Sequence, residues 1–240
     1  MNIKTNLANK NNYGSARSLN KIKYIVIHYT ANDGDTDESN GKYFKNNIVK
    51  ASAHYFVDDD SITQSVPDNY VAWSVGGKKY SDCSKTGGGK CYGKCTNTNS
   101  ISIELCDDVK NGVVYPSAKT IENALGLTKY LMEKYNVPKE NVIRHFDVTG
   151  KYCPKYWMDD NKWKGEFWNK LGTQAVSEFK PYLVKVTADV LNVRQGAGTN
   201  FNVVTTIKEN QVYTIVAENN GWGKLKSGVG WISLKYTVKL

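Results

Sequence analysis

The sequence predicts an α/β domain, in which helices cover a mixed sheet, followed by a second, small all-β domain. Over the first two thirds of the chain, short apolar runs rich in β-branched residues alternate with longer segments of helical periodicity, as in a sheet covered by helices. From Tyr182 onward the pattern changes to short alternating runs separated by turn residues. With 240 residues, 40% of them hydrophobic, the chain is long enough to bury a large and a small core.

Three strands are expected in the larger domain, at residues 23–30, 52–57 and 100–105. The first is an apolar, β-branched run that leads into His28, and strand ends are common places for functional polar groups. In the third, strict alternation puts Glu104 on the face opposite Ile101 and Ile103. If this were an edge strand, Glu104 would be an ordinary surface carboxylate.

Three helices are expected between and after these strands. Residues 37–50 begin with acidic residues and carry apolar side chains behind them. Residues 117–135 form the clearest helix, with Ser117 as its cap. Its apolar face consists of Ile121, Ala124, Leu125, Thr128, Leu131 and Met132. Residues 159–171 predict a shorter, tryptophan-rich helix that Gly172 ends.

The smaller domain is expected to start after a polar linker. We place domain boundaries at residues 1–172 and 182–240, with residues 173–181 as the linker. Alternating runs at residues 184–186, 203–207 and 212–216 predict strands. Trp222 and Trp231 are interpreted as core residues rather than as a platform for a ligand.

Candidate metal ligands lie in one segment, which we expect to be too irregular for a helix. Its sequence is Arg144-His145-Phe146-Asp147-Val148-Thr149-Gly150-Lys151-Tyr152-Cys153-Pro154. Imidazole nitrogen and thiolate sulfur are ligands that zinc prefers, and a catalytic zinc takes three protein ligands. The third ligand is then expected upstream, at His28. Each residue also has an ordinary interpretation: a hydrogen-bonded polar histidine, a buried cysteine that packs as a small hydrophobe, or a solvated loop lysine.

Together these segments resemble the zinc-dependent N-acetylmuramoyl-L-alanine amidases of the phage-lysozyme and peptidoglycan-recognition type. The marks are Ile25-Val26-Ile27-His28, Ser52-Ala53-His54-Tyr55-Phe56-Val57, Ser100-Ile101-Ser102-Ile103-Glu104-Leu105 and the His145 to Cys153-Pro154 segment, in the family's order. The resemblance extends to about Gly172. It implies a catalytic domain of the peptidoglycan-recognition/amidase type that hydrolyses the amide between N-acetylmuramic acid and the L-alanine of the stem peptide.

The resemblance also implies a role for each matching residue. His28, His145 and Cys153 would hold one catalytic Zn²⁺, Glu104 would be the general base, and Lys151 would face the developing oxyanion. His54 also matches a frequent family histidine, but it lies outside the family's zinc set, and a packing or supporting role is expected. The chain departs from the family at Ala53, where some phage relatives have a tyrosine. It also departs at Trp73-Ser74-Val75-Gly76, which lacks the family's substrate-contacting histidine.

The tail resembles a bacterial SH3-like wall-binding domain. The resemblance rests on Leu191-Asn192-Val193-Arg194-Gln195-Gly196-Ala197-Gly198-Thr199, Gly221-Trp222-Gly223-Lys224-Leu225 and Gly230-Trp231-Ile232. It implies that bacterial peptidoglycan is the partner, without indicating which residues bind. Anionic wall polymers would also fit the formal net charge of +9. Because the sequence shows neither a Lys/Arg helix stripe nor an RNA-binding aromatic motif, no nucleic-acid partner is expected.

The sequence shows no membrane span, and its N-terminus lacks the apolar stretch of a signal peptide. With the resemblance, this predicts a phage or prophage endolysin, made in the host cytoplasm and acting on the bacterial cell wall after release. Two other functions stay open. One is a non-catalytic peptidoglycan-recognition module, although Cys153 argues against it. The other is a protein with a structural zinc, which would need a fourth protein ligand.

Four further cysteines gather around an insertion at residues 82–98 that is rich in glycine and lysine. Cys83, Cys91, Cys95 and Cys106 could hold a structural zinc, form two disulfides in an oxidising environment, or remain unpaired thiols. Their spacings fit neither common zinc knuckle, so the sequence does not choose among the three states.

Overall fold

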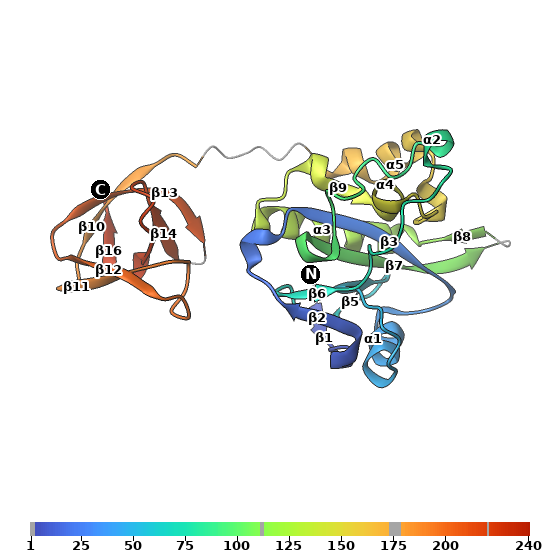
Figure 1. Ribbon diagram of the computed structural model, residues 1–240, viewed down its shortest axis with the longest axis horizontal. Coiled ribbons are helices and arrows are strands. Elements are labelled where there is room, and N and C mark those ends of the chain that lie inside the picture. The colour runs from blue at the N-terminus through green and yellow to red at the C-terminus, as the bar shows by residue number, and fades with distance from the viewer. Residues whose placement is uncertain (1–2, 111–112, 173–178, 220) are drawn as a thin grey trace. The chain divides into compact units, whose positions relative to one another are not determined.

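The computed structural model describes residues 3–110, 113–172, 179–219 and 221–240. The chain divides into two compact units, residues 1–174 and 175–240 (Figure 1). Most of the expected linker, residues 173–178, lies outside the described residues. In the described part of the chain, no helix is both long and apolar enough to cross a membrane.

The first unit is built on a mixed sheet of seven strands in the order β1-β5-β4-β7-β3-β9, with β8 paired to β7. Strands β4, β7, β3 and the terminal β9 run parallel to one another, whereas β5 is antiparallel to β4 and β8 to β7. The expected mixed α/β sheet is therefore confirmed. The strand bounds are β1 Ile3–Thr5, β3 Tyr24–Asp33, β4 Tyr55–Val57, β5 Ile62–Gln64, β7 Ser100–Lys110, β8 Val113–Tyr115 and β9 Val142–Arg144. A separate two-stranded ribbon pairs β2 Tyr13–Ala16 with β6 Tyr70–Ala72.

One face of this sheet holds the main hydrophobic core. Alternate residues such as Ile25 and Ile27 on β3 and Ile103 on β7 are fully buried there. The core also takes in buried residues of α3, Ala118–Tyr135, and of α5, Asp160–Glu166. The expected cap of α3 is confirmed, since the Ser117 hydroxyl accepts a hydrogen bond from the Thr120 amide.

The opposite face carries the intervening positions of the same strands, including His28 and Glu104. A smaller apolar cluster, in which Val26 of β3 packs with Ile143 of β9 and with Val148, lies on this side. Strand β7 has β4 on one side and β3 on the other. The interpretation of Glu104 as a surface carboxylate on an edge strand is therefore wrong, because this strand is central.

Several element boundaries differ from the expectations. Helix α1, Asp37–Asn46, ends four residues early, and β4 covers only the last three residues of its expected strand. The expected helix at residues 159–171 is interrupted at Phe167, whose φ of −131° is not helical, so that a 3₁₀ turn, Trp168–Leu171, follows α5. The segment expected to be irregular begins with the short helix α4, His145–Thr149, which Gly150 ends at φ 89°. Helix α2, Cys83–Thr86, lies in the insertion.

The second unit is a seven-stranded antiparallel sheet in the order β12-β11-β15-β14-β13-β10-β16, as expected for a small all-β domain. Its core centres on Val184, Val193, Ile215 and Ile232. Trp222 and Trp231 are only partly buried and lie outside that core, so their interpretation as core residues is wrong. The strand bounds are β10 Tyr182–Val186, β11 Val190–Arg194, β12 Val203–Lys208, β13 Val212–Asn219, β14 Trp222–Leu225, β15 Trp231–Ser233 and β16 Thr237–Lys239.

Candidate metal centre

The candidate site lies over the sheet face opposite the main core, on β3 and β7 and just beyond the end of β9. In the register of β3 and β7, His28 stands directly opposite Glu104. On the other side of β3, Ile27 pairs with Arg144, the last residue of β9, and His145 follows as the first residue of α4. Strands β3 and β7 continue past the site to Asp33 and Lys110, so His28 and Glu104 project from a face of the sheet rather than from its end.

The structure brings together the three expected metal ligands. Nδ1 of His28 lies 3.8 Å from Sγ of Cys153, and the rings of His28 and His145 are 4.7 Å apart between centroids. One donor atom from each of the three residues falls within 4.8 Å of the others, and all three residues are buried. Zinc holds nitrogen at about 2.0–2.1 Å and thiolate sulfur at about 2.3 Å, so donor atoms at this spacing can share one ion.

The electrostatics of the three residues also suit a metal. Burial lowers the pKa of His28 well below its usual value, and the nearby His145 lowers it further. Burial, aided by the charge of Lys151, lowers the pKa of His145 to about 4, so both imidazoles are neutral near pH 7. Nε2 of His28 and Nδ1 of His145 are buried without a hydrogen-bond partner among the described residues. Two neutral imidazoles and a thiol with unsatisfied nitrogens are a donor set that zinc fits.

Glu104 reaches the same space from β7. Its Oε1 lies 3.8 Å from Nδ1 of His28, and its side chain is 19% exposed. Burial raises the pKa of this carboxyl to about 8, while the ammonium of Lys151 opposes the rise. Oε2 of Glu104 has no hydrogen-bond partner in the described part of the chain. The carboxylate is therefore poised for an exchange of protons near neutral pH.

Lys151 is an exposed residue just beyond α4. Its positive charge lowers the pKa values of both His145 and Glu104, which places it within electrostatic reach of the site. The loop that carries it is closed by backbone hydrogen bonds from Phe146 N to Cys153 O, 2.9 Å, and from Cys153 N to Lys151 O, 2.7 Å. These bonds hold His145 and Cys153 in one short unit.

Arg144 fastens this loop from beneath, a role that the sequence analysis missed. Its Nε and Nη2 donate to the two carboxylate oxygens of Asp147 at 2.9 and 2.8 Å, and its Nη1 donates to Trp157 O at 2.7 Å. A further ion pair joins Nη2 to Asp160 at the start of α5. The guanidinium therefore ties the start of α4 to the chain just after Cys153. Opposite charges at positions i and i+3 were the available signal.

The insertion, together with Tyr80 just before it, packs against α4. The amides of Tyr80, Gly89 and Cys91 donate to the carbonyls of Thr149, Phe146 and Asp147 at 2.8, 2.9 and 2.7 Å. All five cysteines of the chain are free thiols in this structure. Cys106 packs with Ala53 and Phe56 rather than with the cysteines of the insertion. The four cysteines outside the site do not form a metal-binding group among the described residues.

His54 is fully buried and does not join the three ligands. Its Nδ1 accepts a hydrogen bond from the amide of Ser102 at 3.1 Å, and its Nε2 lies 3.2 Å from the carbonyl of Tyr70 and 3.0 Å from Nη2 of Arg17. Burial, together with the adjacent guanidinium of Arg17, lowers the pKa of His54 to about 3. His54 therefore links β7 of the central sheet to the β2–β6 ribbon.

Comparison with known families gives two matches along the chain. A family model described as N-acetylmuramoyl-L-alanine amidase matches residues 18–156, which include the three candidate ligands and Glu104. A model described as bacterial SH3 domain matches residues 189–238. Each match falls within one of the two compact units.

Curated relatives and solved structures agree with the first match. The amidase CwlL of Bacillus licheniformis is 32% identical in an alignment of 170 positions that covers 65% of this chain and 44% of that protein. The amidase CwlA of Bacillus subtilis (strain 168) is 32% identical over 66% of this chain and 53% of that protein. The chain thus spans about half the length of these relatives.

Among solved structures, the catalytic domain of XlyA aligns with a TM-score of 0.55 and 30% identity, covering 72% of this chain and 100% of that structure. PlyL aligns with a TM-score of 0.56 and 29% identity, covering 73% of this chain and 100% of that structure. These likenesses agree with the α/β fold of the first unit.

Proposed function

Because the chain belongs to the N-acetylmuramoyl-L-alanine amidase family, we propose that it is a peptidoglycan hydrolase of the endolysin kind. The bond hydrolysed is the amide between N-acetylmuramic acid and the L-alanine of the stem peptide. The observation that carries the proposal is the convergence of His28, His145 and Cys153 beside Glu104 over one face of the sheet.

The three buried residues would hold a single Zn²⁺. When bound, zinc supplies a Lewis acid that acidifies water and polarises a carbonyl. The chain's contribution is to present two imidazoles that burial keeps neutral, and a thiol that is deprotonated when it binds metal. Arg144 and the closed loop hold His145 and Cys153 at a fixed spacing, so little reorganisation is needed on binding.

Glu104 acts as the general base and then as the acid. Its carboxylate takes a proton from the attacking water and delivers it to the leaving amine of L-alanine. The position beside His28 gives it access to the same water, and the partly buried environment strengthens its interaction with the proton. Lys151 lies within electrostatic reach and stabilises the negative charge that develops on the carbonyl oxygen.

The second unit anchors the chain to the bacterial cell wall, where the substrate is. A bacterial SH3 domain after the catalytic unit would keep the enzyme near many equivalent bonds of one polymer. Peptidoglycan is the principal partner, and the net charge of +9 favours anionic wall polymers as additional ones.

Chelation and metal analysis test this function. Dialysis against a chelator should abolish lysis of purified walls, and one equivalent of zinc should restore it. Cys153→Ser should bind metal far more weakly, because a thiolate ligand is lost. Cys91→Ser, which changes a cysteine outside the site, should keep one zinc per chain. Lytic protein that contains no metal would exclude the mechanism, and metal-loaded protein that binds walls without cutting them would indicate a recognition module.

A further inference from the structure

Strand β3 carries a bulge shortly after the metal ligand His28. The strand pairs with β7 in register as far as Tyr29, and the next pair is Asp33 with Asp107. Three residues of β3, 30–32, therefore oppose a single residue of β7 and form the β3 bulge. Extra residues of this kind bend a strand and change the direction of the groups beside them.

The β3 bulge contains a strained backbone position, Ala31, whose φ is 58°. Residues with a side chain rarely adopt this left-handed conformation, so the position needs support from its surroundings. Asp107 of β7, which is 1% exposed, provides that support. Its Oδ2 accepts a hydrogen bond from the Ala31 amide at 2.9 Å, and its carbonyl accepts one from the Gly34 amide at 3.1 Å. One buried residue thus holds the strained position and the chain just beyond it.

A second carboxylate joins the β3 bulge to its surroundings. Oδ1 of Asp35 accepts hydrogen bonds from the Asp107 amide and from the Thr30 hydroxyl, both at 3.1 Å. Oδ2 of Asp35 accepts a hydrogen bond from the side-chain amide of Asn40 on α1 at 2.6 Å. The β3 bulge is therefore fixed to both β7 and α1, and the backbone that leads out of His28 is fixed with it.

The backbone held in this way borders the loop that carries Cys153. The ring of Tyr29 packs edge-on against the ring of Tyr156, with 5.5 Å between the centroids, and Tyr156 is the third residue after Cys153. Burial raises the pKa of the Cys153 thiol, and a hydrogen bond from the Tyr29 backbone opposes that rise. The residue between His28 and the β3 bulge thus meets the metal loop through its ring and its backbone.

We propose that Asp107 is a positioning residue for the metal centre. By holding the β3 bulge, it keeps His28 and Cys153 at a spacing that suits one ion, 3.8 Å between Nδ1 and Sγ. Asp107 acts through the backbone of β3 and not as a ligand, since it is outside the group of described residues that could hold the ion. The inference rests on the proposed function, because it takes His28, His145 and Cys153 as ligands of one metal ion.

Four substitutions in the full chain test this role. Asp107→Ala removes the acceptor of the Ala31 amide. Asp107→Asn keeps an oxygen for that bond and is the conservative rescue, since its new NH₂ group replaces Oδ1, which has no hydrogen-bond partner among the described residues. Asp35→Ala loosens the β3 bulge from its other side and tests the same inference if Asp107→Ala does not fold. Asp108→Ala removes an exposed carboxylate from the next position of β7 and is the matched control.

The measurements are zinc affinity, by competition with a chelator, and the absorption spectrum of the cobalt-loaded chain. Cobalt(II) accepts the same nitrogen and sulfur ligands, and its sulfur-to-metal charge-transfer band reports on the thiolate. Asp107→Ala should bind zinc about tenfold more weakly, as for other groups that orient metal ligands. Its charge-transfer band should shift, because the sulfur and the imidazole no longer keep their parental positions. Asp35→Ala should show smaller changes in the same direction, and Asp107→Asn and Asp108→Ala should match the parent.

A residue that only stabilises the fold would lower the unfolding transition of the metal-free chain without changing either measurement. Parental zinc affinity and a parental charge-transfer band in a folded Asp107→Ala would therefore overturn the proposal, and the same result in Asp35→Ala would do so if Asp107→Ala does not fold. An Asp107→Asn variant that is impaired as much as Asp107→Ala would overturn the role assigned to the hydrogen bond with Ala31.

The same preparations separate this inference from the proposed function. If the parent binds zinc and cobalt but does not hydrolyse a soluble muropeptide, the amidase proposal fails, while affinity and spectrum still decide the role of Asp107. If the parent hydrolyses the muropeptide and Asp107→Ala keeps its zinc affinity and its spectrum, only the positioning role is lost. A parent chain that binds no metal would contradict both.

Discussion

His28 on β3 and Glu104 on β7 stand opposite each other in the sheet, with Nδ1 and Oε1 3.8 Å apart. Both residues belong to central strands whose other face is packed in the main core. The backbone that presents the metal ligand and the proposed base is therefore fixed by packing that neither side chain provides. Changes at these two side chains should alter chemistry more than folding.

Replacing Glu104 with glutamine tests its role as a base. Glu104→Gln keeps size and shape but cannot take a proton, so turnover should fall by about 10²–10⁴-fold. Zinc content and the unfolding transition should stay close to those of the parent. Glu122→Gln, a matched change at an exposed carboxylate on α3, should leave turnover unchanged. Near-parental hydrolysis by Glu104→Gln would remove this residue from the mechanism.

Replacing Arg144 tests whether its hydrogen bonds hold the loop between His145 and Cys153 in place. Arg144→Gln leaves the largely buried carboxylate of Asp147 without its partner, and breaking such a pair costs about 3–5 kcal/mol of the free energy of unfolding. Zinc affinity, measured by competition with a chelator, should fall about 10–100-fold, as for other groups that orient ligands. Asp160→Asn removes only the half-exposed partner and should change both quantities little. Unchanged zinc affinity in a folded Arg144→Gln variant would show that Arg144 stabilises the fold without positioning the zinc ligands.

The buried His54 predicts a pH dependence of stability. The pKa of His54 is about 3 in the folded chain, against the ordinary value of 6.5 that applies to the unfolded chain. Between pH 3 and pH 6.5 the unfolded state therefore binds more protons than the folded state. The contribution of His54 to the free energy of unfolding is fully present above about pH 6.5. It is lost as the pH falls below that value, by about 1.4 kcal/mol per pH unit.

His54→Asn keeps an acceptor for the Ser102 amide but does not titrate. Urea denaturation of chelated protein should therefore show the stability difference between parent and variant shrinking, or changing sign, as the pH falls from 6.5 toward 4. A constant difference would contradict the buried, neutral state of His54.

Separating the two units tests the domain boundaries. Each unit has its own hydrophobic core, so residues 1–172 should fold, bind zinc and hydrolyse soluble muropeptide at close to the full-length rate. On intact walls the same fragment should be slower, because the tethering effect is lost. Residues 182–240 alone should sediment with walls and release nothing. The assignment of the second unit as a wall anchor would be refuted if residues 182–240 do not bind walls and residues 1–172 lyse cells as well as the whole chain.

The sequence predicted the strands and helices that periodicity marks. The run that leads into His28, the alternation at Glu104 and the cap at Ser117 are local signals, and the structure has β3, β7 and α3 there. It did not predict the helical turn that begins at His145, because five residues carry too little periodicity. The break at Phe167 was also missed, since apolar spacing continues through it.

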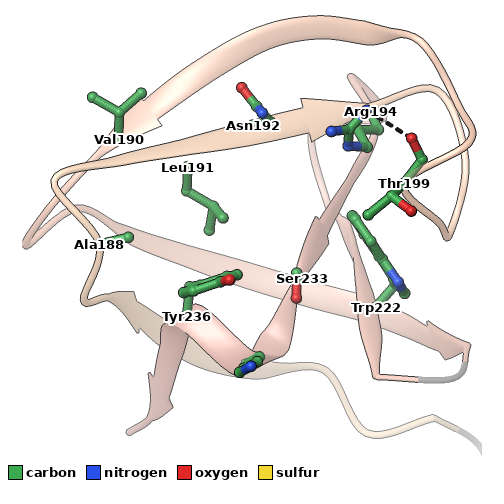
Figure 2. Close-up of a pocket in the computed structure, with 10 residues that line it drawn as sticks. Ala188, Val190, Leu191, Asn192, Arg194, Thr199, Trp222, Ser233 and Tyr236 are labelled. Atoms are coloured by element: carbon green, nitrogen blue, oxygen red, sulfur yellow. Dashed lines mark hydrogen bonds between the residues drawn. The ribbon is translucent and has the colours of Figure 1, made fainter.

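Contacts between distant segments escaped prediction for a different reason. The central position of β7 depends on pairing with both β3 and β4, which no local pattern encodes. Trp222 was interpreted as a core residue because aromatic side chains usually bury much of their surface, yet it lines a pocket together with residues of β11 and the loop after it (Figure 2). The resemblance named the metal ligands, but the bonds of Arg144 to the chain beyond Cys153 appear only when the loop is folded.

Mass analysis of digested peptidoglycan tests the central claim most directly. Purified walls treated with the zinc-loaded chain should release peptides with a new N-terminal alanine, while the glycan strands keep their length and gain no reducing ends. The same walls treated with Glu104→Gln should release almost none. New reducing sugars, or new amino termini on residues other than that alanine, would contradict the assignment of the bond that this chain cleaves.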